Sequence, residues 1–402
     1  MGCKALFPVP ERMLIVIPLQ TPGKRIVSLQ DYWDDMIGQY LHLAKNIFLS
    51  NCKRLSFPYK LTFAVTYRCN SRCKTWNIWK KKDNDELTKE EIELFFTSTN
   101  NFSWIDLTGG EPSLRKDFSD ICTIIHQQCK QLALLHFPTN GYLTEKIVRD
   151  TETIRATGSP FKTIITVSTD GNEALNDDIR GIKGAWKRQI DTLKSLHAID
   201  GVEAVAGMTL SPFNFDQCES TYKSIKKVLP WFTPKDFHIS LMNYSENFYD
   251  NWEQKKQGVR SPEQEILLEK MIESTKRYKR MIGIPKDPKA LLEYFFHKRA
   301  ERFLRTGTTP LPCHALKSSC FIDPTGEVYP CITFNHPLGN LRNYNYDLQK
   351  IWDLETTKRL QKEIWNGSCP QCWTGCDGYQ TIMGNLTRLF SSRWRGISRI
   401  TC

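Results

Sequence analysis

From residue 61 onward, short apolar segments alternate with segments of helical periodicity, and this alternation limits the possible folds more than any other feature of the chain. The apolar segments have the length and the flanking turn residues of strands. They are residues 61–67, 104–108, 132–137, 162–168, 202–210 and 237–242. Helical patterns lie between them, at residues 117–130, 145–156, 185–197 and 218–228, and another begins at Thr88, with Glu91 at capping-box spacing.

Strands that alternate with helices predict a parallel sheet with the helices outside it. Six repeats, rather than the eight of a closed barrel, predict an α/β fold with an open, partial (βα)6 barrel. A small cysteine-rich α+β extension follows. We divide the chain into an N-terminal segment at residues 1–57, the partial barrel at 58–260, a helical bridge at 261–308 and the extension at 309–402.

Residues 31–49, before the barrel, place apolar side chains at the spacing of a helix. Such a helix either packs its apolar face on the core or lies on a membrane surface. Its polar face carries charges of both signs, which favours the core-facing alternative.

Lys and Arg number 55 and Asp and Glu number 44, which gives a net charge of +11. The positive residues are spread along the chain, which favours a solvated basic surface over an anionic partner such as a nucleotide sugar or an acidic lipid head group, and we expect no nucleic-acid partner. The longest apolar run, residues 13–17, is far below the roughly 18 residues that span a bilayer. It also lacks the flanks of a signal peptide. We therefore expect no membrane span and a cytoplasmic location.

Chemically distinctive residues follow the expected strands. Cys69 and Cys73 come just after the first strand, and a Gly-Gly-Glu-Pro motif ends the second. Glycines let a backbone approach a ligand closely, and a carboxylate can receive an ammonium group. The carboxyl ends of parallel strands form the usual ligand-binding face of such folds, so we expect these groups to share one site.

Further polar residues follow the third and fourth strands, namely Asn140, Ser168 and Asp170. The hydroxyl of Ser168 and the carboxylate of Asp170 suit the polar atoms of a ribose or an amino acid. Taken one at a time, each of the three residues could equally cap the next helix. Their occurrence together, in this order, favours a binding site.

These motifs resemble those of the radical SAM superfamily, in which three cysteines of a C-x3-C-x2-C loop hold a [4Fe–4S] cluster and the fourth iron binds S-adenosylmethionine (SAM). The resemblance covers roughly residues 58–385. It implies that Cys69 and Cys73 bind that cluster and that Arg180, before Gly181, grips the SAM carboxylate. It also implies that the following residues line SAM: Gly109, Gly110, Glu111, Pro112, Asn140, Ser168 and Asp170.

Position 76, where that family has its third cysteine, is a tryptophan. The indole N–H of Trp76 has no lone pair for iron. Its ring also takes the space in which a sulfur would lie about 2.3 Å from a metal. Three explanations stay open: a pseudo-enzyme that retains the SAM pocket, a substitution or misreading of a Cys or UGA codon, and another cysteine that folds into the loop.

Six of the fourteen cysteines fall between residues 313 and 376. In a chain without a secretory signal, clustered cysteines indicate metal before disulfides. Residues 322–331 read as a β-hairpin with a Pro-Thr-Gly turn. Cys313, Gly326 and Cys331, followed by Cys369-x2-Cys372, resemble the SPASM and Twitch extensions of radical SAM enzymes.

In those extensions the cysteines hold auxiliary [4Fe–4S] clusters. The resemblance implies one cluster here, on Cys313, Cys331, Cys372 and either Cys376 or Cys369. Cys320 is either a further ligand or a buried thiol. Zinc is the rival metal, but the barrel upstream favours iron–sulfur.

The resemblance implies an enzyme that reductively cleaves SAM to a 5′-deoxyadenosyl radical and abstracts hydrogen from a peptide or small-molecule substrate. It also implies an electron donor such as flavodoxin or ferredoxin. The sequence identifies no residue that acts on the substrate. Because of Trp76, a catalytically degenerate SAM-binding or iron–sulfur protein is the alternative.

Overall fold

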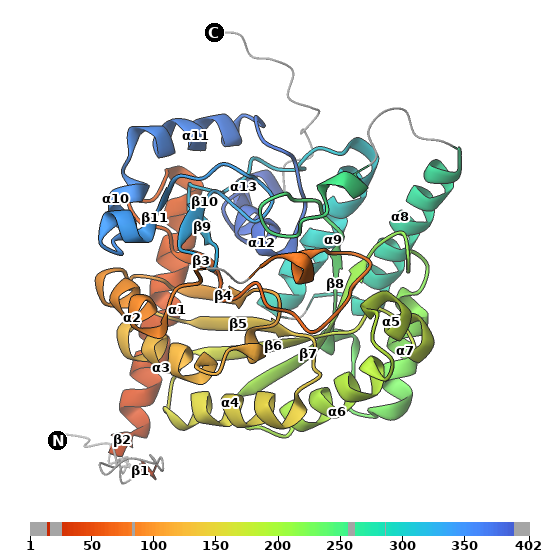
Figure 1. The fold of residues 1–402 in the computed structure, drawn as a ribbon, viewed down its shortest axis with the longest axis horizontal. Helices are drawn as coiled ribbons and strands as arrows, with labels where there is room; N and C mark the ends of the chain where they lie inside the picture. The colour runs from red at the N-terminus through yellow and green to blue at the C-terminus, as the bar shows by residue number, and fades with distance from the viewer. Residues whose placement is uncertain (1–13, 17–25, 83–84, 256–261, 286, 390–402) are drawn as a thin grey trace, which may run out of the picture.

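The computed structural model describes residues 14–16, 26–82, 85–255, 262–285 and 287–389. Within these residues, nine strands form one sheet in the order β11-β10-β9-β3-β4-β5-β6-β7-β8 (Figure 1). The six neighbours at its centre run parallel and follow the order of the chain. They are β3 (Lys60–Ala64), β4 (Trp104–Thr108), β5 (Leu134–Thr139), β6 (Lys162–Ser168), β7 (Val202–Leu210) and β8 (Phe237–Leu241). The prediction of a partial barrel is confirmed.

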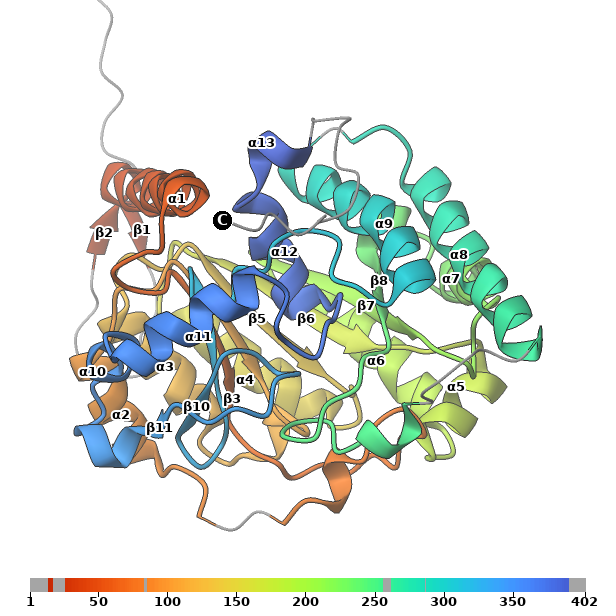
Figure 2. The ribbon, with the colours of Figure 1, turned by 90° about the horizontal axis from the view of Figure 1, so that it is seen from above.

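Helices connect these strands on the outer face of the sheet (Figure 2). They are α2 (Lys89–Ser98), α3 (Phe118–Gln128), α4 (Thr144–Ala156), α5 (Glu173–Arg180), α6 (Ala185–His197) and α7 (Cys218–Val228). Thr88 and Glu91 form the predicted capping box at the start of α2. The sequence analysis missed α5, a short helix capped by Asn172 and ended by Gly181 in a left-handed conformation. Short 3-10 turns occupy Ile78–Lys80, Pro112–Leu114, Pro234–Asp236, Trp252–Gln254 and Leu341–Tyr344.

Burial alternates along the middle strands of the barrel. In β6, Thr163, Ile165 and Val167 are buried, whereas Ile164 and Thr166 are only partly buried and line an interior cavity. Side chains of successive strand residues point to opposite faces. The barrel therefore packs one face of the sheet against its helices and turns the other face toward a hollow.

The first long helix, α1 (Leu29–Cys52), departs from its prediction. Trp33, Ile37, Leu41 and Phe48 are exposed by 51%, 51%, 66% and 69%, so its main apolar stripe faces away from the core. The prediction that this face packs on the core holds only in part, since Ile47, with Leu43 and Leu49, packs against Leu55, Tyr59 and Trp104. The inward face is partly polar, and its His42 lies 2.9 Å from the hydroxyl of Ser103.

The N-terminal segment also contains two short strands, and the bridge consists of two helices. β1 (Leu14–Val16) and β2 (Ile26–Ser28) pair antiparallel before α1. The bridge forms α8 (Pro262–Ile282) and α9 (Pro288–Thr306), which pack on one another. Among the helices in the described residues, none is long and apolar enough to cross a membrane.

The cysteine-rich extension continues the barrel sheet. β9 (Ser319–Ile322) runs parallel to β3, and β10 (Glu327–Tyr329) forms with it the predicted hairpin. β11 (Gly339–Asn340) adds a further edge strand. The helices are α10 (Leu348–Trp352), α11 (Glu355–Trp365), α12 (Gly375–Met383) and α13 (Leu386–Leu389). Figure 2 shows α12 and α13 with α9 and α1 on the inner side of the sheet, opposite α3 and α4.

Candidate functional site

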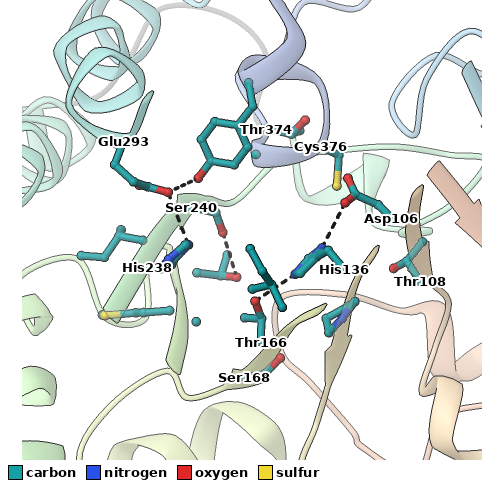
Figure 3. A pocket seen from close by; sticks show the side chains of 18 of the residues that line it. Asp106, Thr108, His136, Thr166, Ser168, His238, Ser240, Glu293, Thr374 and Cys376 are labelled. Atoms are coloured by element: carbon teal, nitrogen blue, oxygen red, sulfur yellow. Dashed lines mark hydrogen bonds and ion pairs between the residues drawn. The ribbon is translucent and has the colours of Figure 1, made fainter. Parts of the chain in front are cut away.

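The interior of the barrel holds a cavity of about 1110 Å³. Strands β4 to β8 form its floor, and α1, α9 and α12 supply the facing wall. Figure 3 shows polar side chains pointing into it from both sides. Ordinary ligand pockets measure roughly 300–1000 Å³. The cavity therefore has room for a cofactor and a second ligand together.

Most of the site residues expected from the sequence line this one cavity, at its carboxyl-end loops. Those that line it are Cys69, Cys73, Gly109, Gly110, Glu111, Asn140, Ser168, Arg180 and Cys376. Pro112 and Asp170 lie just behind the wall and do not line it. Four separate loops thus converge on one end of the cavity, as parallel strands require.

The two glycines of the Gly-Gly-Glu-Pro motif are needed because the loop after β4 packs against the loop after β3. A Cβ on Gly109 would lie 2.4 Å from the carbonyl oxygen of Thr66, and one on Gly110 would lie 2.3 Å from that of Arg68. Backbone oxygens at that distance cannot be moved aside at low cost, so no side chain fits at either position.

Glu111 is 1% exposed and ties two loops together. It accepts hydrogen bonds from the backbone N–H and hydroxyl of Ser113, at 3.1 and 2.6 Å, and from the hydroxyl of Thr139 at 2.8 Å. The backbone N–H of Asn140 donates to its other oxygen at 2.5 Å. Burial raises the pKa of Glu111, while these donors oppose the rise. The carboxylate is therefore fixed in place before any ligand arrives.

Arg180 forms a buried ion pair with Asp170, with Nη2 2.7 Å from Oδ2. Burial raises the pKa of Asp170, and the guanidinium opposes that rise. A second guanidinium nitrogen lies 3.8 Å from Sγ of Cys73. The Nε of Arg180 has no hydrogen-bond partner among the described residues, and the side chain lines the cavity. One face of the guanidinium is thus committed to the protein and one nitrogen remains for a ligand.

The cysteine loop is held by the end of α5. The backbone N–H groups of Arg72 and Lys74 donate to the carbonyls of Arg180 and Ile179, at 3.0 and 2.9 Å. Burial raises the pKa of Cys69 to about 12, and the nearby charges of Glu111 and Cys73 add to that rise. The loop is therefore formed, with two thiols at the cavity wall.

The ring of Trp76 stacks on that of Tyr249, with centroids 4.3 Å apart and an angle of 24° between the planes. Within the described residues, no three side chains of Cys, His, Asp or Glu stand close enough to hold a single metal ion. No third ligand of these types therefore joins Cys69 and Cys73 there. The residues present supply two of the three thiolates that a SAM-binding cluster needs, and as they stand they do not fit it.

Four cysteines of the extension are near neighbours. Burial raises the pKa of Cys313 to about 12, with Asp377 and Cys369 adding to the rise. Burial and the charges of Cys331, Asp377 and Cys313 raise the pKa of Cys372 well above its ordinary value. Zinc holds its ligands at about 2.0–2.3 Å from one point. Within the part of the chain that the structure describes, no three of these thiols are gathered closely enough to hold a single metal ion. An iron–sulfur cluster on them, with zinc as the rival, stays a prediction.

The other two cysteines of the extension stand apart. Cys376 lines the cavity, and Figure 3 shows it pointing toward Asp106. Cys320 lies in β9 opposite Leu61, and burial alone raises its pKa to about 12. These positions favour Cys369 over Cys376 as the fourth ligand, and they favour Cys320 as a core thiol.

A polar row on the inner face of β3 to β6 was missed from the sequence. Lys60, fully buried, lies 2.9 Å from Asp106, and the other oxygen of Asp106 lies 3.2 Å from Nδ1 of His136. Nε2 of His136 lies 2.9 Å from the hydroxyl of Thr166. Burial alone would raise the pKa of Asp106, but Lys60 and His136 hold it well below its ordinary value. The sequence did contain a signal for this row: each of the four strands carries a charged or polar residue among apolar ones, on the face opposite its helix-facing residues.

A second polar group faces the first across the cavity (Figure 3). Nδ1 of His238, on β8, lies 3.3 Å from Glu293 of α9, which also accepts a hydrogen bond from Tyr379 of α12. Burial lowers the pKa of His238 to about 4. Burial opposes ionisation of Glu293, but His238 and His297 lower its pKa to about 2. Because three elements far apart in the sequence meet here, no local pattern could have revealed the group.

The chain is similar to known proteins along most of its length. Residues 313–373 match the SPASM family, described as an iron-sulfur cluster-binding domain. The chain is 23% identical over 339 residues to the antilisterial bacteriocin subtilosin biosynthesis protein AlbA of Bacillus subtilis, covering 81% of this chain and 68% of AlbA. It is 24% identical over 330 residues to the mycofactocin maturase MftC of Mycolicibacterium smegmatis, covering 79% of this chain and 76% of MftC.

Solved structures share the fold. The chain superposes on SuiB of Streptococcus suis bound to SAM with a TM-score of 0.52 at 16% identity, over 84% of this chain and 74% of SuiB. It superposes on native anSMEcpe with a TM-score of 0.54 at 14% identity, over 83% of this chain and 98% of that one. The SPASM match and these relatives together support a radical SAM enzyme with a SPASM domain. Enzymes of this class carry [4Fe–4S] clusters and bind SAM.

Proposed function

We propose that the chain is a radical SAM enzyme that binds SAM at the carboxyl end of the barrel cavity, with its substrate deeper in the same cavity. The observation that carries this proposal is the convergence of Gly109, Gly110, Glu111, Ser168 and Arg180 on one end of one cavity. That cavity continues past SAM-sized space into the barrel, so a second ligand would lie within reach.

The proposed roles follow from the contacts. The paired glycines let their loop pack against the loop after β3, and both line the cavity where the methionine part of SAM would lie, with Pro112 closing the loop. Glu111 would supply a carboxylate acceptor to SAM and Asn140 a side-chain amide, and hydrogen bonds hold both residues in place. Arg180 offers its unpaired Nε to the SAM carboxylate while Asp170 holds the opposite edge of the guanidinium. Ser168 offers a hydroxyl to the ribose.

We further propose that Cys313, Cys331, Cys369 and Cys372 hold one auxiliary [4Fe–4S] cluster, which would supply or accept single electrons. Burial raises the pKa of all four thiols, and the buried carboxyl of Asp377 lies close enough to add to each rise. A flavodoxin or a ferredoxin would be the external donor.

The substrate class is proposed from the relatives. AlbA serves subtilosin biosynthesis, MftC is named a mycofactocin maturase, and SuiB has been solved with its precursor peptide SuiA. These names support a peptide substrate, and a small molecule is the alternative. The segment after β8 would form part of the substrate wall, since Leu241 and Tyr249 line the cavity.

Trp76 favours a second candidate function, a SAM-binding or iron–sulfur protein without radical chemistry. The ring of Trp76 stacks on that of Tyr249, so the surrounding structure accommodates a tryptophan at this position. Anaerobic reconstitution, followed by dithionite and SAM, separates the two candidates. Release of 5′-deoxyadenosine supports the enzyme, whereas SAM binding in calorimetry without any 5′-deoxyadenosine supports the second candidate.

A further inference from the structure

The end of the cavity opposite the cysteine loop opens through an apolar rim. We call the side chains Tyr40, Leu43, Leu291, Met383 and Leu386 the apolar mouth; all five line the cavity, from α1, α9, α12 and α13. Tyr40, Leu291 and Leu386 are also exposed by 42%, 44% and 42%. Side chains that both line a cavity and face solvent mark an opening. The proposed SAM residues lie at the other end, so this opening serves the second ligand.

Five charged side chains that line the cavity form ion pairs with one another. Lys162 and Lys289 both pair with Glu203, the former at 2.5 Å. Lys235 pairs with Asp287 at 3.0 Å. A peptide that threads through the mouth would bring one N–H and one C=O per residue, each of which needs a partner once it loses water. The five side chains of the apolar mouth offer only the hydroxyl of Tyr40 and the sulfur of Met383 as polar atoms, so the mouth suits an alkyl chain, which needs no hydrogen-bond partners.

The apolar surface continues outside the cavity. Tyr40 belongs to the same exposed stripe of α1 as Trp33, Ile37 and Leu41. An apolar ligand that extends beyond the mouth would therefore meet more apolar surface rather than charged groups. Removing such a surface from water is favourable roughly in proportion to its area.

His238 lines the cavity, and its buried Nε2 is the atom that we expect to bind the polar head of that ligand. Nδ1 of His238 faces the ionised Glu293, so this nitrogen carries the ring proton and Nε2 presents a lone pair. Nε2 of His238 has no hydrogen-bond partner among the described residues. Both ring nitrogens of His136, by contrast, are engaged by Asp106 and Thr166. His238 is thus the histidine of the cavity with an acceptor to offer.

We propose that the substrate end of the cavity binds an amphipathic small molecule, in which a long apolar chain lies along the apolar mouth and a hydroxyl head donates a hydrogen bond to Nε2 of His238. Glu293 and Tyr379 act as positioning residues for that ring. This inference deepens the proposed function by taking its small-molecule alternative in place of a peptide, and it rests on that proposal only for which end of the cavity SAM takes.

The test uses decan-1-ol and decyl methyl ether as probes, measured by equilibrium dialysis with the whole chain. The two probes share the apolar chain, but only the alcohol can donate a hydrogen bond. We expect the alcohol to bind about fivefold more tightly, the effect of one net hydrogen bond. His238→Phe keeps the ring and removes the acceptor, and it should make the two probes bind equally. The comparison within the natural chain needs no variant, so it stands even if His238→Phe does not fold.

The mouth is tested by Leu386→Lys, which places a charge that must lose water when the chain binds, and we expect both probes to weaken by about tenfold or more. Leu94→Lys is the matched control, because Leu94 is exposed by 54% on α2 and does not line the cavity. It should leave both affinities unchanged.

Equal affinity of the natural chain for the alcohol and the ether would overturn the role of His238. Equal effects of the two lysine substitutions would overturn the mouth, and so would failure of both probes to bind. The ligand class is tested by competition against labelled decan-1-ol. If a leucine-rich hexapeptide displaces it at a lower concentration than unlabelled decan-1-ol does, the proposed ligand class is overturned. None of these measurements needs iron or SAM cleavage, so this inference and the proposed function can fail separately.

Discussion

The loop after β3 and the extension each bring cysteines together, but they differ in what completes the set. The extension places four thiols near one another; burial raises the pKa of Cys313 and Cys372, and neighbouring thiols add to both rises. The loop has two thiols, and the third family position holds Trp76 in a stack with Tyr249. Both regions are otherwise well formed, since the loop keeps its backbone bonds to α5. A cofactor site can thus lose one ligand while the protein around it stays intact.

The largest expected effect comes from restoring the missing thiol. Trp76→Cys places sulfur at the spacing that the loop already provides, and iron should rise by about four per chain, the content of one cubane. Dithionite and SAM should then yield more 5′-deoxyadenosine than the natural chain releases under the same conditions. Iron analysis and chromatography of the nucleoside give the two readouts.

Trp79→Cys is the matched control, since Trp79 lies in the same loop and also lines the cavity. Its spacing from Cys73 is wrong, so neither iron nor 5′-deoxyadenosine should rise. A Trp76→Cys variant that gains iron but makes no nucleoside would show that the pocket itself has decayed. A variant that gains no iron would show that the cluster loop has been misplaced.

The next effect is loss of iron from the extension. Cys313→Ser with Cys331→Ser should remove about four irons per chain after anaerobic reconstitution, because a cubane cannot be held by the remaining two thiolates. Cys69→Ser with Cys73→Ser should remove few or none.

Single substitutions then distinguish the two candidates for the fourth ligand. Cys369→Ser should lower the iron content, whereas Cys376→Ser and Cys320→Ser should leave it unchanged. Zinc in place of iron, or equal losses from all three variants, would contradict the ligand set.

The contrast between the two regions also explains what the sequence could predict. The strands and most connecting helices follow from periodicity and capping, as the pair Thr88 and Glu91 illustrates. The residues at the carboxyl-end loops, such as Glu111 and Ser168, could be found because parallel strands bring successive loop ends together. Their convergence on one cavity is a consequence of topology rather than of any single motif.

Other features depend on contacts that no local pattern reports. Glu293 and His238 are 55 residues apart in number but face one another because α9 crosses the inner side of the sheet. The apolar residues of α1 divide between solvent and core, because Phe48 is exposed whereas its neighbour Ile47 packs against the cluster that contains Trp104. Pro112 and Asp170 were placed in the right loops, but one residue too deep to touch the cavity.

A smaller effect, on folding stability, tests the ion pair behind the loop. Arg180→Ala leaves Asp170 buried and unpaired, and we expect the free energy of unfolding to fall by about 3–5 kcal/mol. Arg180→Leu combined with Asp170→Leu removes both charges and should recover most of that loss. Urea unfolding measures both variants. If the double variant is as unstable as the single one, the guanidinium stabilises the loop through Cys73 rather than through Asp170.

The smallest effect concerns the junction between the extension and the barrel. Arg342 of the extension donates from Nε and Nη2 to Glu91 of α2, at 2.6 and 3.0 Å, and the pair is only partly exposed. Arg342→Ala should lower the free energy of unfolding by about 1–2 kcal/mol, more than a solvent-exposed pair and less than a buried one. Lys358→Ala is the control, because its pair with Glu355 lies within the extension and is exposed. It should cost about 0.5 kcal/mol or less.

The same junction sets a pH dependence with a definite sign. The hydrogen bonds from Arg342 lower the pKa of Glu91 to about 2 from its ordinary value of 4.5. A carboxyl with a lowered pKa stabilises the fold above its ordinary pKa, and that contribution disappears as the pH falls toward the lowered value. The natural chain and Arg342→Ala should therefore differ most above pH 4.5 and converge toward pH 2. If the difference between them is constant across that range, Arg342 stabilises the junction by packing and its charge is not needed.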